Sequence, residues 1–129
     1  LGAGVLENTL HALCQQARCA PDEVQVWLGP CIGPDAFEVG DDVRQAWGVS
    51  PHEVSPWFKP AQHSGKWFAD LAGAARQRLQ RAGVAQIHGD DSTAAWCTVT
   101  QSDRFFSHRR DGRSGRFAAC IWRASNVSA

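Results

Sequence analysis

Residues 5–28, "VLENTLHALCQQARCAPDEVQVWL", decide the fold class because their hydrophobic side chains change from one spacing to another. Apolar residues recur at helical spacing in the first part, which predicts a helix with one apolar face over residues 5–17. Pro21 ends this pattern, and residues 24–28 then alternate as a strand does, with Val24 and Val26 on the same side. The stretch therefore predicts a helix that returns into a sheet.

The rest of the chain continues this alternation of helices and strands. The segment "KWFADLAGAARQRLQRAG", residues 66–83, predicts a helix whose apolar stripe includes Leu71 and Leu79, and Gly83 suits a left-handed helix end. We expect a short extended piece and a short helix within residues 35–48, and short strands at 84–88 and 94–100. The fold class that follows is an α/β (or α+β) sandwich, in which a mixed β-sheet is packed with helices.

The segment "FFSHRRDGRSGRFAACIW", residues 105–122, carries two extended runs around a glycine-containing turn, and it predicts a C-terminal β-hairpin. All of its basic residues except His108 are arginines, and a guanidinium can grip a phosphate or a carboxylate with two hydrogen bonds. The alternative is a solvated hairpin whose arginines pair with Asp103 and Asp111. Residues alone leave both interpretations open.

The loop "GPCIGP", residues 29–34, cannot pair regularly because it repeats Gly-Pro. Such a loop can turn backbone N–H groups towards an anion, so residues 29–33 are a candidate wall of a binding site. Cys31 could be an exposed nucleophile on this bend. Since no histidine lies near it in the sequence, we favour a small buried thiol instead.

Length and composition are those of one globular domain of 129 residues, with thirteen basic and thirteen acidic side chains. A net charge of zero argues against nucleic acid or anionic lipid as a general partner. No apolar run is long enough for a membrane span and no leader opens the chain, so we expect a cytoplasmic protein. Five irregularly spaced cysteines indicate reduced thiols, and histidine spacing offers no sequence-local metal site.

Four separated motifs resemble the YfiH family: "GVLENT", "LGPCIGPDAFEVGDDV", "KWFADL" and "CTVTQSDRFFSHRRDGRSGR", in this order. This family is known variously as multicopper polyphenol oxidoreductase (laccase), peptidoglycan editing factor and purine nucleoside phosphorylase. Its members are about twice as long as this chain. The resemblance implies that residues 1–129 are the C-terminal part of a single YfiH-like domain.

For the complete protein, the resemblance implies a zinc-dependent enzyme that phosphorolyses purine nucleosides and deaminates adenosine. The family's metal ligands, two histidines and a cysteine, lie in segments of the type "VHG", "DC" and "HAGWRG", none of which occurs here. We therefore assign no metal ligand and no catalytic residue, and expect the isolated chain to be inactive. The substrate-binding residues that we expect are Arg109, Arg110, Arg116, Gly29, Cys31 and Gly33.

Alternative functions remain at this point. The family resemblance also allows copper-dependent phenol oxidation, although a three-ligand site lacks the several coppers that this reaction requires, and it allows editing of a peptidoglycan precursor. A non-enzymatic nucleic-acid-binding module would use Phe105 or Phe106 for stacking and the arginines for phosphates. His108 departs from the family pattern "FFSYRR", which leaves a role of that tyrosine in doubt.

Overall fold

The computed structural model describes residues 1–50 and 53–122, and it confirms an α/β arrangement of helices and mixed strands. Two sheets are present in these residues: a parallel pair, β1 with β5, and an antiparallel sheet of order β2-β4-β3. The elements are α1 (Val5–Ala17), β1 (Gln25–Leu28), β2 (Glu38–Gly40), α2 (Asp41–Ala46), β3 (Phe58–Pro60), β4 (Lys66–Ala69), α3 (Leu71–Arg81), β5 (Gln86–Gly89) and α4 (His108–Asp111), with 3-10 turns at Pro21–Glu23 and Ala94–Trp96.

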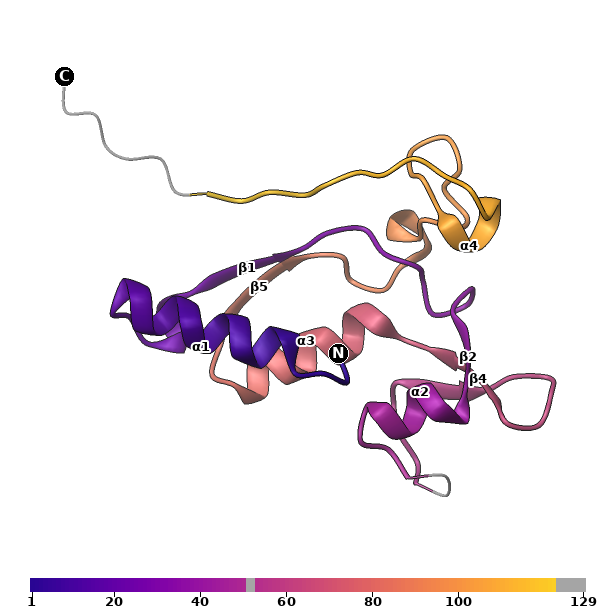
Figure 1. Ribbon diagram of the computed structural model, residues 1–129, viewed down its shortest axis with the longest axis horizontal. Helices are drawn as coiled ribbons and strands as arrows, with labels where there is room; N and C mark the ends of the chain where they lie inside the picture. Colours follow the sequence, from indigo (N-terminus) through magenta and orange to yellow (C-terminus); the bar gives the residue numbers. More distant parts are fainter. Residues whose placement is uncertain (51–52, 123–129) are drawn as a thin grey trace.

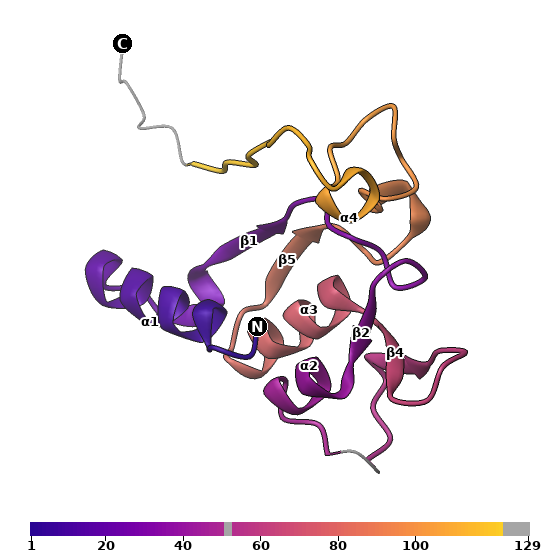
Figure 2. The same ribbon diagram turned by 45° about the vertical axis from the view of Figure 1, so that its right-hand side comes forward.

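The parallel pair forms the centre of one half of the molecule. Gln25 pairs with Gln86 and Leu28 with Gly89, so both strands end at the same edge. Helices α1 and α3 lie against the same face of this pair (Figures 1 and 2), as expected when helices connect parallel strands. The buried cluster between them consists of Leu10, Val24, Leu79 and Val84.

The antiparallel sheet has its own small core. Val39, Phe58 and Ala69 are buried together, one from each strand. The guanidinium of Arg44 in α2 lies 3.9 Å from the ring centroid of Trp67 and is almost completely buried. This cation–π contact joins α2 to the sheet. The sheet lies near the first residues of α3, whereas β5 follows the last residues of that helix (Figure 1).

The predicted helix over residues 66–83 is partly wrong, because its first four residues form strand β4. The carboxylate of Asp70 accepts a hydrogen bond of 2.8 Å from the Gly73 N–H and so caps α3 at its first turn. Trp67 and Phe68, before this cap, are aromatic residues that favour strands. Gly83 does follow the helix with a positive φ of 95°, as predicted.

The predicted strand at 94–100 is also wrong. Residues 94–96 form a 3-10 turn, and the backbone N–H of Thr98 donates to the carbonyl of Cys31 at 2.9 Å. The expected short strand and helix within 35–48 and the strand at the end of 84–88 are confirmed as β2, α2 and β5. The error at 94–100 arises because its apolar residues lie in turns, where Ala94 and Ala95 are exposed and Cys97 is buried.

The predicted C-terminal β-hairpin is wrong as well, since residues 105–122 contain no strand. They form the single-turn helix α4 followed by an extended segment that runs away from it (Figure 1). Ser107 begins the helix, because its hydroxyl accepts from the Arg110 N–H, and Gly112 with φ of 68° ends it. The Ser107 cap therefore starts a helix where Asp111 and Gly112 had predicted the turn of a hairpin.

Candidate functional site

The loop of residues 29–33 leaves the carboxyl end of β1, where the chain also leaves β5. Asp90, which is buried at 2% exposure, follows β5 and reaches back to this loop. Its Oδ2 accepts hydrogen bonds from the backbone N–H of Cys31 at 3.2 Å and from the Cys31 thiol at 3.3 Å. Because carboxyl ends of parallel strands meet at one edge, the sheet itself brings this pair together.

A second set of contacts holds the far end of the loop. The Gly33 N–H donates to the Sγ of Cys97 at 3.2 Å, and a Cβ added at Gly33 would lie 2.9 Å from the Cys97 Cβ. Gly33 is thus required for close packing. Burial would raise the pKa of Cys97, but hydrogen bonds from Thr100, Gly33 and Val99 outweigh it and lower that pKa.

Cys31 is half-buried, and its thiol stays protonated. Burial, and then the charge and hydrogen bond of Asp90, raise its pKa from 9.0 to about 12. A protonated thiol is a poor nucleophile. This supports the interpretation of Cys31 as a small packed side chain of the loop, with its sulfur donating to the Asp90 carboxylate.

The side chain of Arg110, a residue of α4, binds backbone carbonyls of the protein. Its guanidinium donates to the carbonyls of Thr98 at 2.9 Å, Val99 at 3.2 Å and Phe105 at 3.1 Å. It also forms an ion pair with Asp111 at 2.7 Å, a pairing that the solvated alternative expected. Acceptors within the protein therefore occupy the hydrogen-bond donors of Arg110.

Arg109, the neighbouring residue, points to another part of the chain. One of its terminal nitrogens donates to the carbonyl of Glu38 at 2.9 Å, and its guanidinium carbon lies 5.5 Å from the ring centroid of Phe37. The side chain is exposed, and its other donors face no acceptor recorded among the described residues. Arg109 therefore has donors left for a ligand.

A pocket of about 340 Å³ lies where the loop, α4 and the extended segment meet. Both aromatic and polar residues line it, and Phe106 and Phe117 are exposed at 53% and 47%. Its lining consists of Pro30, Cys31, Ile32, Phe37, Thr98, Phe106, Ser107, His108, Arg109 and Phe117. The volume is at the lower end of the range for small-molecule sites.

Of the six residues that the sequence analysis proposed for substrate binding, Cys31 and Arg109 line this pocket. Gly29 and Gly33 lie in the same loop without lining it. Arg110 faces the backbone, and Arg116 is exposed and donates to Ser114 and Gly115 next to it. Phe37 and Thr98 also line the pocket, but no sequence pattern marks them, because only the fold brings them beside the loop and α4.

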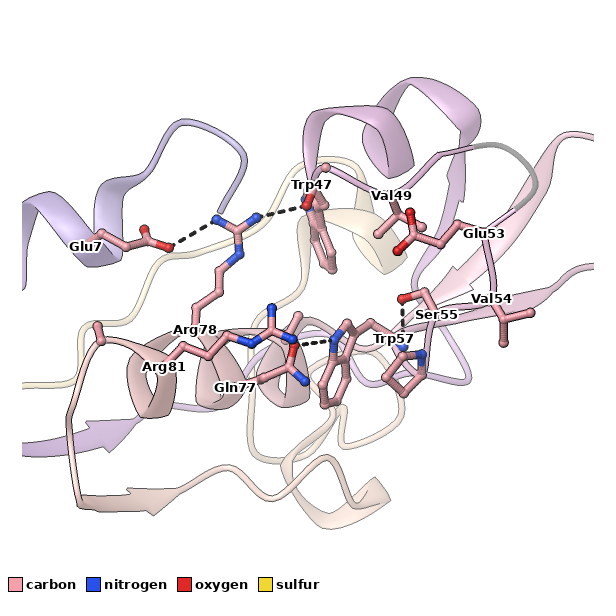
Figure 3. A pocket seen from close by; sticks show the side chains of 14 residues that line it. Glu7, Trp47, Val49, Glu53, Val54, Ser55, Trp57, Gln77, Arg78 and Arg81 are labelled. Carbon is pink, nitrogen blue, oxygen red and sulfur yellow. Dashed lines mark hydrogen bonds and ion pairs between the residues drawn. The ribbon is translucent and has the colours of Figure 1, made fainter.

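A larger hollow of about 630 Å³ lies between α2, α3 and the segment before β3 (Figure 3). Arg78 crosses it, with one nitrogen 3.2 Å from Glu7 Oε1 and another 3.0 Å from the Trp47 carbonyl. Trp57 donates from Nε1 to Gln77 at 3.1 Å. Arg78 and Trp57 thus bond to other groups of the hollow, whereas Glu7 Oε2 is buried without a recorded partner among the described residues. None of the proposed site residues lines this hollow, so we place the candidate site at the smaller pocket.

No three His, Cys, Asp or Glu side chains in residues 1–50 and 53–122 are grouped as a metal ion would need. His52, one of the five histidines, lies outside the described residues. Among the helices in the described part of the chain, none is long and apolar enough to cross a membrane.

Comparisons with known proteins agree with these motifs. Residues 1–124 match the family described as multi-copper polyphenol oxidoreductase laccase. The chain is 45% identical over 122 residues to the purine nucleoside phosphorylase YfiH of Escherichia coli (strain K12), covering 95% of this chain and 46% of that protein. It is 43% identical over 122 residues to a purine nucleoside phosphorylase of Pseudomonas aeruginosa, covering 95% and 47%.

A solved structure shows the same fold. The crystal structure of Neisseria meningitidis protein NMB0706 matches with a TM-score of 0.72 and 43% sequence identity, covering 86% of this chain and 42% of that one. The chain spans about half the length of the relatives it matches. It belongs to the multi-copper polyphenol oxidoreductase (laccase) family, to which its motifs and its α/β fold both correspond.

Proposed function

We propose that residues 1–129 are the C-terminal part of a YfiH-like domain whose whole protein cleaves purine nucleosides with inorganic phosphate. The relatives from Escherichia coli and Pseudomonas aeruginosa bear the name purine nucleoside phosphorylase, and this chain covers about half of each. Phosphorolysis needs a phosphate held against the anomeric carbon of the ribose. A purine also needs a flat apolar surface on which to stack.

The observation that carries the proposal is the position of Arg109. Arg109 lines the pocket, and Phe37, Phe106 and Phe117 lie around the same space. A fixed guanidinium positions and neutralises an anion, and the rings offer their faces to a base. We therefore assign Arg109 to the phosphate or ribose end and the phenylalanines to the purine end.

The residues around the pocket have distinct supporting roles in this proposal. The carbonyl of Glu38 and the ring of Phe37 hold Arg109 in one direction, which lowers the entropy lost when an anion binds. Arg110 fixes the turn that carries Arg109 through its bonds to Thr98, Val99 and Phe105. Arg110 is thus a positioning residue rather than a ligand contact.

Zinc and adenosine deamination belong to the proposal for the whole protein. A bound metal ion would supply an activated water for the deamination. The described residues do not fit a metal site, because no ligand group of three is present among them. No step of our proposal for this chain passes through a metal, and a cytoplasmic location stays a prediction.

The test is product analysis by mass spectrometry of the whole protein that contains this chain. Adenosine is supplied with and without inorganic phosphate, and the 129-residue chain is run beside it. We expect adenine and ribose 1-phosphate only when phosphate is present, and only from the whole protein. Arg109→Ala should raise the KM for phosphate by about ten- to a hundredfold, the effect of losing a charged hydrogen bond.

The matched control is Arg113→Ala, which removes another exposed arginine close in sequence that does not line the pocket. An unchanged phosphate KM in Arg109→Ala would overturn the role of Arg109. No turnover of nucleosides by the whole protein would overturn the proposed function. The family description would then favour copper-dependent oxidation of phenols, which oxygen consumption with a phenol would detect.

A further inference from the structure

The end of helix α1 brings two cysteines together. Arg18 adopts a left-handed conformation with φ of 51°, and the N–H groups of Arg18 and Cys19 both donate to the carbonyl of Cys14. The bond from Cys19 is 3.2 Å long. The bond from Cys19 across the left-handed residue Arg18 is that of a Schellman helix end, which a contact between the side chains of the first and last residue of the turn frequently accompanies. Apolar residues usually make that contact, and here both are cysteines.

The two thiols share one environment. Cys14 and Cys19 are both half-buried and pack against the cluster of Leu10, Val24 and Leu79. Burial, a hydrogen bond with the Cys19 thiol and the charges of Cys19 and Glu23 raise the pKa of Cys14. A disulfide needs Cα atoms about 4.4 to 6.8 Å apart. The 3.2 Å backbone hydrogen bond from Cys19 to Cys14 brings these two residues together across the helix end.

We infer that Cys14 and Cys19 form a reversible dithiol, which closes to a disulfide by exchange with a small-molecule disulfide of the glutathione class. The Cys19 thiolate attacks one sulfur of the small disulfide, and the first small thiol leaves. Cys14 then loses its proton to solvent and attacks the Cys19 sulfur of the mixed disulfide, and the second small thiol leaves. One small disulfide is thereby reduced to two thiols while the cysteine pair is oxidised.

The other cysteines lack this arrangement. The Cys31 thiol donates to Asp90, and Cys97 is buried at 3% exposure with Gly33 bonded to its sulfur. Cys120 is exposed in the extended segment, so a small disulfide can reach it. We expect Cys120 to take up one small thiol as a mixed disulfide, without closing a ring.

The dithiol lies at the far end of α1 from the chain's N-terminus, whereas α4 lies beyond the opposite end of β1 (Figures 1 and 2). The inference is therefore independent of the proposed function. Closing the pair ties the turn of Arg18 into a covalent ring and restrains the unfolded chain, so the oxidised form should unfold at a higher temperature.

The experiment incubates the folded chain with oxidised glutathione at neutral pH, quenches with acid and alkylates the remaining thiols. Intact mass and peptide mapping then identify each cysteine. We expect one glutathione adduct, on Cys120, together with a peptide that has lost two hydrogens because Cys14 is linked to Cys19, and a reducing agent should reverse both. Cys14→Ser should instead stop at a glutathione adduct on Cys19, and Cys120→Ser should still close the ring.

Circular dichroism checks that each variant is folded. Where Cys14→Ser lowers stability, Cys14→Ala provides the same test, since it keeps the site apolar. Separate glutathione adducts on both Cys14 and Cys19 in the folded wild-type chain would overturn the inference. So would a disulfide that joins either of them to another cysteine, or two thiols that stay free while Cys120 reacts.

Discussion

Two walls of the pocket are held in different ways. Buried groups hold the loop of residues 29–33 in place, since Asp90, Cys97 and Thr98 all form hydrogen bonds with it. The extended segment of residues 113–122 forms the other wall, and its recorded hydrogen bonds in the described part of the chain reach no further than residues 111–116.

The difference shows which wall is built into the fold. Buried polar groups are costly to leave unpaired, so the loop keeps its shape only with its partners in place. The extended segment relies on surface contacts, such as the rings of Phe105 and Phe117 at 6.0 Å. We therefore expect substitutions of the buried residues that bond to the loop to affect stability more than substitutions in the extended segment.

Removal of the carboxylate beneath the loop should have the largest effect. Asp90→Ala leaves the half-buried N–H of Cys31 without its acceptor and also removes the 2.9 Å bond to the Ser92 N–H. We expect the free energy of unfolding to fall by about 3 kcal/mol. Urea denaturation followed by tryptophan fluorescence measures this change.

Asp91→Ala is the matched control, because Asp91 is the neighbouring aspartate and is exposed. Its own contact is local, with the Thr93 N–H at 3.1 Å. The control should lose much less stability than Asp90→Ala. Equal losses in the two variants would contradict the claim that buried hydrogen bonds hold the loop.

Substitution of Arg110 should reduce thermal stability by an intermediate amount, and its neighbour Arg109 provides the comparison. Arg110→Ala removes the donors to three backbone carbonyls, so we expect Tm to fall on the order of 5 °C. Arg109→Ala removes an exposed side chain with one such bond and should leave Tm nearly unchanged. Differential scanning calorimetry measures both, and a larger loss in Arg109→Ala would reverse the roles that we assign to them.

The effect of the Cys31 thiol is absent at neutral pH and develops only above pH 9. In the unfolded chain this thiol ionises near 9.0, whereas in the fold burial and Asp90 raise its pKa to about 12. The folded protein therefore holds the proton while the unfolded chain loses it, so this contribution to stability is complete below pH 9 and decreases between pH 9 and 12. Cys31→Ser should show a shallower decline than wild type in urea titrations across this window.

Modification of the thiols tests the protonation of Cys31 independently of the urea titrations. Iodoacetamide should modify the exposed Cys120 far faster than Cys31 at pH 8, because the protonated thiol is unreactive. Rapid modification of Cys31 in the folded chain would contradict a protonated, hydrogen-bonded thiol.

Periodicity and local stereochemistry predicted the elements in which one signal dominates. The apolar face of residues 5–17 and the alternation from Val24 are confirmed as α1 and β1, because period alone separates a helix from a strand there. Errors arose at 66–69, 94–100 and 105–122, where caps and turns competed with the hydrophobic pattern. The Asp70 and Ser107 caps act through single hydrogen bonds, which a pattern of apolar residues does not contain.

By itself, the sequence determined the family motifs, the alternation of helices and strands, and an arginine-rich segment as a candidate anion site. Only the tertiary structure decided that Arg109 faces the pocket while Arg110 faces the backbone. The physical reason is that adjacent residues in a helical turn point in directions about 100° apart. Their roles then depend on what lies in each direction: Glu38 and Phe37 for Arg109, and the carbonyls of Thr98 and Val99 for Arg110.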